Sequence, residues 1–503
     1  MTDLIIIFVC CLVTIQARKN VLFLVSDDMR PQLGAYEGGD FPSPVHPRAY
    51  SPNLDALAKR SLLLKKAYVQ QALCNPSRSS LLTGRRPDTT HVYDLTHYFR
   101  KVGGNFTTLP QYFKNNGYMT VGMGKIFHPG KEASDYDDPI SWSVPYYQAK
   151  LKGGHYFSKN HSWVAVPKAE YEKYPLPDDI LADHAIKVLR EVAPAAKSGE
   201  QPFFVGLGFL KPHLPFVFRE EFLNLYPMEN ISLPDNPYAP VKMPEVAWFD
   251  FSNLRTFGDI QRLNASGAIN TTFPDDVVKQ LRRAYYSAIS YVDSLVGQVI
   301  QELDNLGLAN NTIISFWGDH GWELGEHGEW CKQTNFENAV HAPMMIHIPG
   351  ETDDGIVTEQ LTEFVDLFPT LVEAAGLTPL PPCPENSTGI LTCREGQSLM
   401  PLVSNPDFEL KKAAFSQFPR SQNGTDIMGY TLRTEQYRYT EWPAFNGPPT
   451  YTPDWTNLYG AELYNHTQDP EENYNRAYDS GYSPIRAVFS SILRKGWRFS
   501  QKP

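Results

Sequence analysis

The stretch Asn20–Asp28, "NVLFLVSDD", decides the fold. Its unbroken apolar run is typical of a parallel β-strand that is buried on both faces of a sheet. The carboxylates Asp27 and Asp28 stand directly at the end of this run. In open α/β sheets, ligands bind outside the carboxyl ends of the strands. The stretch therefore predicts a buried central strand with a polar site at its end.

Further apolar runs alternate with amphipathic segments along the chain. They predict strands over Tyr118–Gly124, Pro202–Phe209 and Asn311–Gly318, and helices over Ser51–Tyr68 and Asp275–Gly307. This alternation indicates an α/β fold with a mostly parallel sheet that is flanked by helices on both faces.

The composition changes near residue 420. The segments "MGYTLRTEQYRYTEW" and "AELYNHTQDPEENYN" are short alternating stretches rich in Tyr and Thr, which suit an antiparallel sheet. We therefore expect a catalytic domain over residues 18–420 and a smaller α+β subdomain over residues 421–503.

The N-terminus indicates entry into the secretory pathway. Leu4–Val13 is an apolar run of ten residues, too short to span a bilayer, and it fits a signal peptide over residues 1–17. The alternative is a buried N-terminal strand. No later segment is apolar and long enough for a transmembrane helix. Nine Asn-x-Ser/Thr triplets favour a glycoprotein of the lysosome, or else a secreted one, and they begin at Asn105, Asn160, Asn230, Asn264, Asn270, Asn310, Asn386, Asn423 and Asn465.

The charge balance excludes some partners. A formal net charge of −11 argues against nucleic acid or an anionic membrane as the main partner. The 13 histidines would remove most of this negative charge in an acidic compartment, where a polyanionic substrate would then be repelled less.

Charged side chains follow each predicted strand. They are Asp27 and Asp28, then Lys125 and His128, then Lys211 and His213, and finally Asp319, His320 and Lys332. The three aspartates would repel one another unless a cation lay between them, and oxygen donors without a thiolate favour Ca²⁺ or Mg²⁺ over zinc. The lysines and histidines form an anion pocket, so the set suits a phosphate or sulfate ester.

Four cysteines remain after the signal peptide. In "QALCNPSRSSLLTGRRPD", Cys74 begins a predicted helix, where free N–H groups favour an anion, and Arg78 lies about one turn along. Cys383 and Cys393 are near enough in sequence to close a loop as a disulfide. A disulfide between Cys74 and Cys331 is the alternative to a special role for Cys74.

The run Cys74-Asn75-Pro76-Ser77-Arg78, followed by "LTGR", resembles the signature of the sulfatase family. In that family a formylglycine-generating enzyme oxidises the cysteine to formylglycine, whose hydrated diol attacks sulfur and forms a sulfated enzyme intermediate. "GKIFHPG", "KPHLPF" and "GDHGWELGEHGEWCKQTNF" resemble family members that remove the 2-O-sulfate of terminal iduronate from the glycosaminoglycans heparan sulfate and dermatan sulfate. The resemblance also implies a fold like that of alkaline phosphatase.

The resemblance assigns roles to individual residues. One Ca²⁺ is expected to be held by Asp27, Asp28, Asp319, His320 and the modified Cys74. His320 stands where many sulfatases have Asn, and imidazole is an unusual Ca²⁺ ligand. Arg78 is expected to hold the modified side chain, and the sulfate and leaving alcohol are expected to meet Lys125, His128, His213 and Lys332. Near pH 5 the histidines are expected to be largely cationic.

Two other functions remain open at this point. One is a sulfatase for another sugar position, or a phosphonate or phosphodiester hydrolase, because some of these share the Cys-x-Pro-Ser-Arg motif. The other is a glycan-binding relative without catalysis, which the intact motif disfavours.

Overall fold

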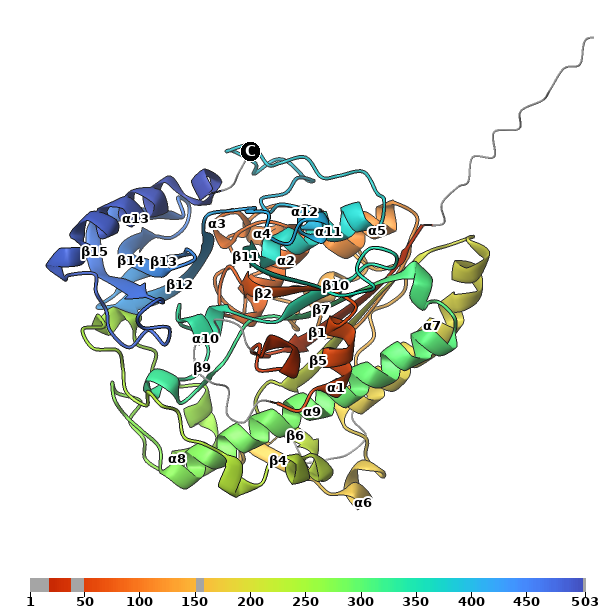
Figure 1. The fold of residues 1–503 in the computed structure, drawn as a ribbon, viewed down its shortest axis with the longest axis horizontal. Helices are drawn as coiled ribbons and strands as arrows, with labels where there is room; N and C mark the ends of the chain where they lie inside the picture. Colours follow the sequence, from red (N-terminus) through yellow and green to blue (C-terminus); the bar gives the residue numbers. More distant parts are fainter. Residues whose placement is uncertain (1–17, 38–48, 151–157, 501–503) are drawn as a thin grey trace, which may run out of the picture.

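The computed structural model describes residues 18–37, 49–150 and 158–500 of the chain. The predicted signal peptide lies outside the described residues. Figure 1 shows a central sheet between layers of helices, with a second sheet formed by the C-terminal part of the chain. None of the described helices is long and apolar enough to cross a membrane.

The central sheet has seven strands in the order β11-β2-β10-β7-β1-β5-β3. Their bounds are β1 (Asn20–Asp27), β2 (Leu62–Tyr68), β3 (Met119–Gly124), β5 (Phe203–Pro212), β7 (Thr312–Gly318), β10 (Met344–His347) and β11 (Ile356–Glu363). Neighbouring strands are parallel except at β10, which is antiparallel to both β2 and β7. The predicted mostly parallel sheet is confirmed.

Strand β1 lies inside the sheet between β5 and β7, and its side chains alternate between two cores. Leu22 and Leu24 pack into the core beneath α1 (Pro52–Ala58), α7 (Pro177–Ser198) and α9 (Asp275–Asn305). Val21, Phe23 and Val25 pack into the opposite core, beneath α2 (Cys74–Thr83), α5 (Leu109–Asn115) and α11 (Leu367–Ala374). Burial on both faces explains why the strand reads as a continuous apolar run.

The predicted helix over Ser51–Tyr68 is wrong in its second half. Helix α1 ends at Ala58, and the chain then forms β2, which pairs with β10 and β11. Leu62, Leu63 and Leu64 are almost completely buried between these neighbours. Pairing within the sheet overrides a local helix preference here, because leucines suit a buried strand as well as a helix.

The remaining elements are short and join the main layers. They are β4 (Trp163–Val166), β6 (Phe216–Arg219), β8 (Glu323–Leu324), β9 (Trp330–Cys331), α3 (Pro87–Thr90), α4 (Phe99–Val102), α6 (Lys168–Tyr171), α8 (Gly258–Gln261), α10 (Glu337–Val340) and α12 (Met400–Ser404).

The C-terminal part contains the expected antiparallel sheet. Its strands are β12 (Ala414–Gln422), β13 (Thr425–Arg433), β14 (Tyr437–Asn446) and β15 (Thr452–Asn465), and α13 (Ser483–Lys495) packs on it through Phe489 and Leu493. The predicted boundary near residue 420 falls inside β12, whose residues all pair with β13. We therefore propose that the subdomain begins before Ala414.

Candidate active site

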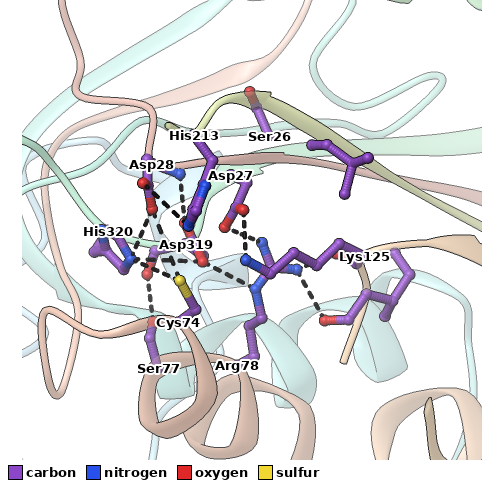
Figure 2. Close-up of polar contacts among 12 residues, drawn as sticks. Ser26, Asp27, Asp28, Cys74, Ser77, Arg78, Lys125, His213, Asp319 and His320 are labelled. Carbon is purple, nitrogen blue, oxygen red and sulfur yellow. Dashed lines mark hydrogen bonds and ion pairs between the residues drawn. The ribbon is translucent and has the colours of Figure 1, made fainter. Parts of the chain in front are cut away.

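The carboxyl ends of four parallel strands bring the predicted residues together (Figure 2). Asp27 ends β1, Lys125 follows β3, His213 follows β5 and Asp319 follows β7. The polypeptide segments are distant in sequence, but the sheet order places their ends side by side.

The turn after β1 aims two carboxylates into the site. Asp28 has φ 62, a left-handed conformation that Asp tolerates better than most residues. The Tyr285 hydroxyl, from α9, donates to the Asp28 carbonyl at 2.7 Å and accepts from the Arg30 amide at 3.0 Å. The Asp28 amide donates to Asp319 Oδ1 at 2.8 Å, so the ends of β1 and β7 are tied together.

Cys74 is the first residue of α2, as predicted, and all ten residues of this helix are buried. Its Sγ lies 3.4 Å from His320 Nε2 and 3.7 Å from Asp28 Oδ1, and it accepts from Lys332 Nζ at 3.1 Å. Burial raises the pKa of the thiol, and the negative charge of Asp27 adds to this effect. The unmodified thiol is therefore protonated and is a poor nucleophile.

The other cysteines settle the disulfide question. Cys383 and Cys393 form a disulfide, whereas Cys74 and Cys331 are both free and buried. The alternative of a disulfide between Cys74 and Cys331 is wrong.

Arg78 joins three strand ends from one position on α2. Its Nε donates to Asp319 Oδ2 at 2.9 Å, and its guanidinium also donates to Asp27 Oδ1 at 3.0 Å. A further N–H group donates to the carbonyl oxygens of Lys125 and Ile126. With these bonds the side chain is fixed and completely buried.

Asp27 is a fully paired carboxylate. Its Oδ1 accepts from Arg78 and its Oδ2 accepts from Lys125 Nζ at 2.5 Å. Burial alone would raise its pKa, but the charges of Lys125 and Arg78 oppose burial, and the pKa lies well below its usual value.

Asp28 is not fully paired. Its Oδ1 accepts from Lys332 Nζ at 2.5 Å, but its Oδ2 is buried and has no hydrogen-bond partner among the described residues. Burial raises the pKa of this carboxyl despite the opposing charge of Lys332. The positive charges around Asp28 therefore neutralise its carboxylate only in part.

The donor set around Asp28 fits a divalent cation. One ligand atom each from Asp28, Cys74, Asp319 and His320 lies within 4.8 Å of the others. His320 Nδ1 is 2.9 Å from the Gly321 carbonyl, a contact that leaves Nε2 free to face Asp28 Oδ1 at 3.2 Å. Carboxylate oxygens with an imidazole and an unpaired buried oxygen match the expected cation site.

His213 reaches the site from the loop after β5. Its Nε2 lies 3.9 Å from Asp28 Oδ2, and the side chain is 39% exposed. Lys211 Nζ donates to the carbonyl oxygens of His213 at 2.5 Å and Pro215 at 2.6 Å. The Asp178 carboxylate, at the start of α7, accepts from the amides of Leu210 and Lys211. The buried Lys211 and Asp178 thus hold the loop that carries His213.

The surroundings of two site histidines oppose the cationic form that the sequence led us to expect. Burial lowers the pKa of His128 to about 3, and the charge of Lys125 adds to this. Burial likewise lowers the pKa of His213 well below its ordinary value, although Asp27 opposes the shift. In the described cluster, burial therefore favours the neutral form of both imidazoles.

Some residues of the site were given no role by the sequence analysis. Ser77 donates to the Asp319 carbonyl, and Tyr285 holds the turn at Asp28. Asp178 lies far from the motifs and is indistinguishable in sequence from a helix N-terminal carboxylate. Trp322 is a packing residue: it is 2% exposed and stacks on Tyr285 with an interplanar angle of 11°.

The chain matches known protein families along most of its length. Residues 19–377 match the family described as "Sulfatase", and residues 325–496 match "N-sulphoglucosamine sulphohydrolase, C-terminal". The chain is 39% identical to iduronate 2-sulfatase of Mus musculus over 93% of this chain and 92% of the relative. It is 38% identical to iduronate 2-sulfatase of Homo sapiens, with 92% and 91% covered.

A solved phosphonate monoester hydrolase from Silicibacter pomeroyi shares the fold. Its TM-score is 0.69 at 21% identity, and 95% of each chain is covered. The family match is more specific than this likeness of fold, because it spans most of the chain and includes Cys74, Arg78 and the three aspartates. This protein is therefore a member of the sulfatase family.

Proposed function

We propose that this protein is an exo-sulfatase that hydrolyses the 2-O-sulfate ester of terminal iduronate in heparan sulfate and dermatan sulfate. As a member of the sulfatase family it is a sulfuric ester hydrolase. The similarity to two iduronate 2-sulfatases over more than nine-tenths of the chain supports the choice of sugar. The single observation that carries the chemistry is the buried cluster in which Cys74 meets Asp28, His320 and Lys332.

Cys74 is proposed to act as formylglycine. The modified residue supplies a hydrated aldehyde, which offers one hydroxyl for attack on sulfur and a second for the later release of sulfate. Arg78 and Lys332 lie where they would orient these hydroxyls, since Lys332 Nζ is 3.1 Å from Cys74 Sγ and Arg78 fixes Asp319 from the next turn of the helix. The raised pKa of the thiol supports a role for the modified residue over the thiol itself.

Calcium is proposed as the resident metal. Asp28, Asp319 and His320 would hold it together with the modified Cys74, and Asp27 would border it. A divalent ion there would offset the charge that Asp28 carries and would polarise the sulfate. Asp27 keeps its pairing with Arg78 and Lys125, which favours a supporting part in the site.

Lys125, Lys332, His128 and His213 are proposed to bind the sulfate and the leaving alcohol. The two ammonium groups supply fixed positive charge in a buried pocket, where it acts strongly on developing negative charge. A neutral imidazole acquires a proton more readily once an anionic sulfate lies beside it. His213 is the better placed donor, because it is partly exposed and faces Asp28.

The secretory pathway, with the lysosome as destination, is proposed as the location. Eight of the nine sequon asparagines are exposed, which leaves them accessible to glycans. Asn465 is the exception: it is buried, and its amide donates to Tyr482. A formylglycine-generating enzyme is the proposed partner in maturation.

The test is direct. The protein is expressed together with a formylglycine-generating enzyme and incubated near pH 5 with a disaccharide that carries 2-sulfated iduronate at its non-reducing end. A Cys74→Ala variant is the control, and free sulfate is measured. Release by the wild type alone supports the proposal. Absence of release, with mass spectrometry proving formylglycine at Cys74, overturns the choice of iduronate.

A further inference from the structure

A second cavity opens beside the candidate active site. It has a volume of about 660 Å³ and we call it the tyrosine–lysine pocket. Its lining residues are Tyr146, Tyr147, Gln148, Lys150, Lys173, Tyr174, Pro175 and Ile180. None of these residues has a role in the candidate active site described above.

Hydrogen bonds place the tyrosine–lysine pocket at the same edge of the sheet as the active site. The Gln148 side chain donates to the carbonyl of Gly124, the last residue of β3, and so does the Tyr146 hydroxyl. Lys125, which follows Gly124, pairs with Asp27. Pro175 and Ile180 border the start of α7, where Asp178 binds the end of β5. Both walls therefore stand at carboxyl ends of strands.

The spacing between strands indicates how far the tyrosine–lysine pocket lies from the active site. β3 lies two positions from β1 in the sheet, so the end of β3, which Tyr146 and Gln148 of the pocket contact, is displaced sideways from β1 by roughly 10 Å. A short oligosaccharide bound with its terminal sugar at Cys74 would reach this far.

The tyrosine–lysine pocket is positively charged, whereas the protein as a whole is negatively charged. The chain carries a net charge of −11, yet the pocket is lined by Lys150 and Lys173 and by no acidic residue. Among the described residues, neither lysine forms an ion pair. A cavity of similar volume near Arg420 differs, because Glu245 and Asp250 line it.

The aromatic wall is rigid. The Tyr147 ring stacks on His184 with centroids 3.5 Å apart, and the Tyr146 ring stacks on Tyr136 at 4.6 Å. Lys173 Nζ lies 5.1 Å from the ring centroid of the partly exposed Tyr174. Fixed aromatic rings beside unpaired ammonium groups suit a sugar ring that carries an anionic substituent.

We propose that the tyrosine–lysine pocket binds the sulfated sugar that adjoins the terminal iduronate of the substrate. This inference rests on the proposed function, because it assumes a sulfated glycan at Cys74. The ammonium groups of Lys150 and Lys173 bind the sulfate group of the adjoining sugar, and the tyrosines bind its ring. The enzyme thereby prefers chains in which the neighbour is sulfated.

The experiment compares two tetrasaccharides that differ only in the sulfation of the sugar next to the terminal 2-sulfated iduronate. We measure kcat/KM for both with the wild type, with the double variant Lys150→Gln/Lys173→Gln, and with Lys187→Gln. Lys187 is a matched control: it is an exposed lysine on α7, about 15 Å from the start of the helix, and it pairs with Glu191. The wild type should prefer the sulfated neighbour.

In the double variant, the preference for the sulfated neighbour should fall about fivefold or more, and it should weaken with added salt in the wild type. Lys187→Gln should keep the full preference. An equal loss for both tetrasaccharides, or no loss for either, overturns the inference.

A binding measurement separates this inference from the proposed function. If the wild type releases sulfate from neither tetrasaccharide, the proposed function fails. The affinity of each fluorescently labelled tetrasaccharide for Cys74→Ala proteins with and without the lysine substitutions then decides the pocket. Weaker binding of the sulfated probe alone supports the tyrosine–lysine pocket, and unchanged binding overturns it.

Discussion

The active-site cluster and a second charge cluster, at the junction with the C-terminal sheet, are both buried but are satisfied differently. The junction cluster consists of Glu337, Arg433, Arg438, His466 and Glu472. Glu337 accepts from Tyr68 on one oxygen and from Arg433 and Arg438 on the other. Glu472 accepts from Arg438 on one oxygen and from the Glu337 amide on the other.

The carboxylates of the active-site cluster are less completely paired than those of the junction. Asp28 Oδ2 has no partner among the described residues, although Asp28 is as deeply buried as Glu337. Burial acts to raise the pKa of Glu337, but Arg433 and Arg438 hold it well below the usual value, whereas the pKa of Asp28 is raised. The two junction carboxylates have partners on every oxygen, although one N–H group of Arg438 and Nδ1 of His466 have none among the described residues. Fully paired buried carboxylates belong to the stability of the fold, whereas the open oxygen of Asp28 can receive a ligand.

The largest expected effect comes from Asp28→Asn. The substitution removes the charge that the cation would offset, so kcat/KM should fall about 10³-fold or more. The melting temperature in calcium-free buffer should fall less than that of Glu337→Gln, because Asp28 loses one ion pair, with Lys332, whereas Glu337 pairs with two arginines. Sulfate release and thermal unfolding measure the two effects. A melting temperature that falls as far as that of Glu337→Gln would contradict the distinction between the clusters.

A substitution in the junction cluster should lower stability and leave activity largely unchanged. Arg438→Met leaves Glu337 and Glu472 without one of their cations, so the free energy of unfolding should fall by about 3–5 kcal/mol. Activity per folded molecule should be largely retained. Arg494→Met is the control, because Arg494 is 39% exposed where it pairs with Glu441, and it should change stability little. Chemical denaturation compares the two variants, and equal losses would refute the prediction.

Calcium binding should distinguish the active-site cluster from the junction cluster without a mutation. If only the native protein binds the ion, a calcium concentration 100 times the Kd should stabilise it by about 2.7 kcal/mol. Unfolding of EGTA-treated protein is followed with and without added CaCl₂. Asp28→Asn should lose this stabilisation and Arg438→Met should keep its full size. The same increment in Asp28→Asn would place the ion elsewhere.

A smaller effect concerns pH and a third buried carboxyl. Glu329 accepts from the Phe249 amide on one oxygen and has no described partner on the other. Burial raises its pKa to about 8 although Arg420 opposes the shift, whereas the unfolded value is about 4.3. The folded state thus holds a proton that the unfolded state loses, and stability should fall as pH rises through this window.

Glu329→Gln should therefore reduce the loss of melting temperature between pH 5 and pH 7.5. Glu191→Gln, at an exposed position, is the control and should leave the loss unchanged. Should Glu329→Gln leave the pH dependence as it is in the wild type, this carboxyl does not hold the proton. A reduced loss in Glu329→Gln would instead show that Asp28 and Glu329 differ from the junction carboxylates in two ways: Asp28 takes a cation and Glu329 keeps a proton.

The central sheet could be read from the sequence where strands are long and apolar. β1, β3, β5 and β7 were predictable on that ground, as was α9. β2 was not, because "LLLKKAY" fits a helix as well, and its strand character comes from pairing with β10 and β11. Those partners follow it by more than 270 residues and give no local signal.

The site was predictable to the extent that strand ends carry it. Asp27, Asp28, Lys125, His213 and Asp319 needed only the rule that ligands bind at carboxyl ends. The unequal pairing of Asp27 and Asp28 was not predictable, because it depends on the side chains of Arg78 and Lys332 reaching across the site. The lowered pKa values of His128 and His213 were not predictable from the sequence either, because they follow from burial.

The complete burial of α2 imposes an order of events on each molecule. Cys74 is 2% exposed, and the helix behind it is enclosed on every side. If Cys74 is oxidised by another protein, as proposed, that protein must meet it while the chain is still extended, because folding removes it from reach. Each molecule would then have a single chance to mature, and a chain that folds first would stay inert. The specific activity of a preparation would therefore depend on the fraction of chains in which Cys74 was oxidised before folding.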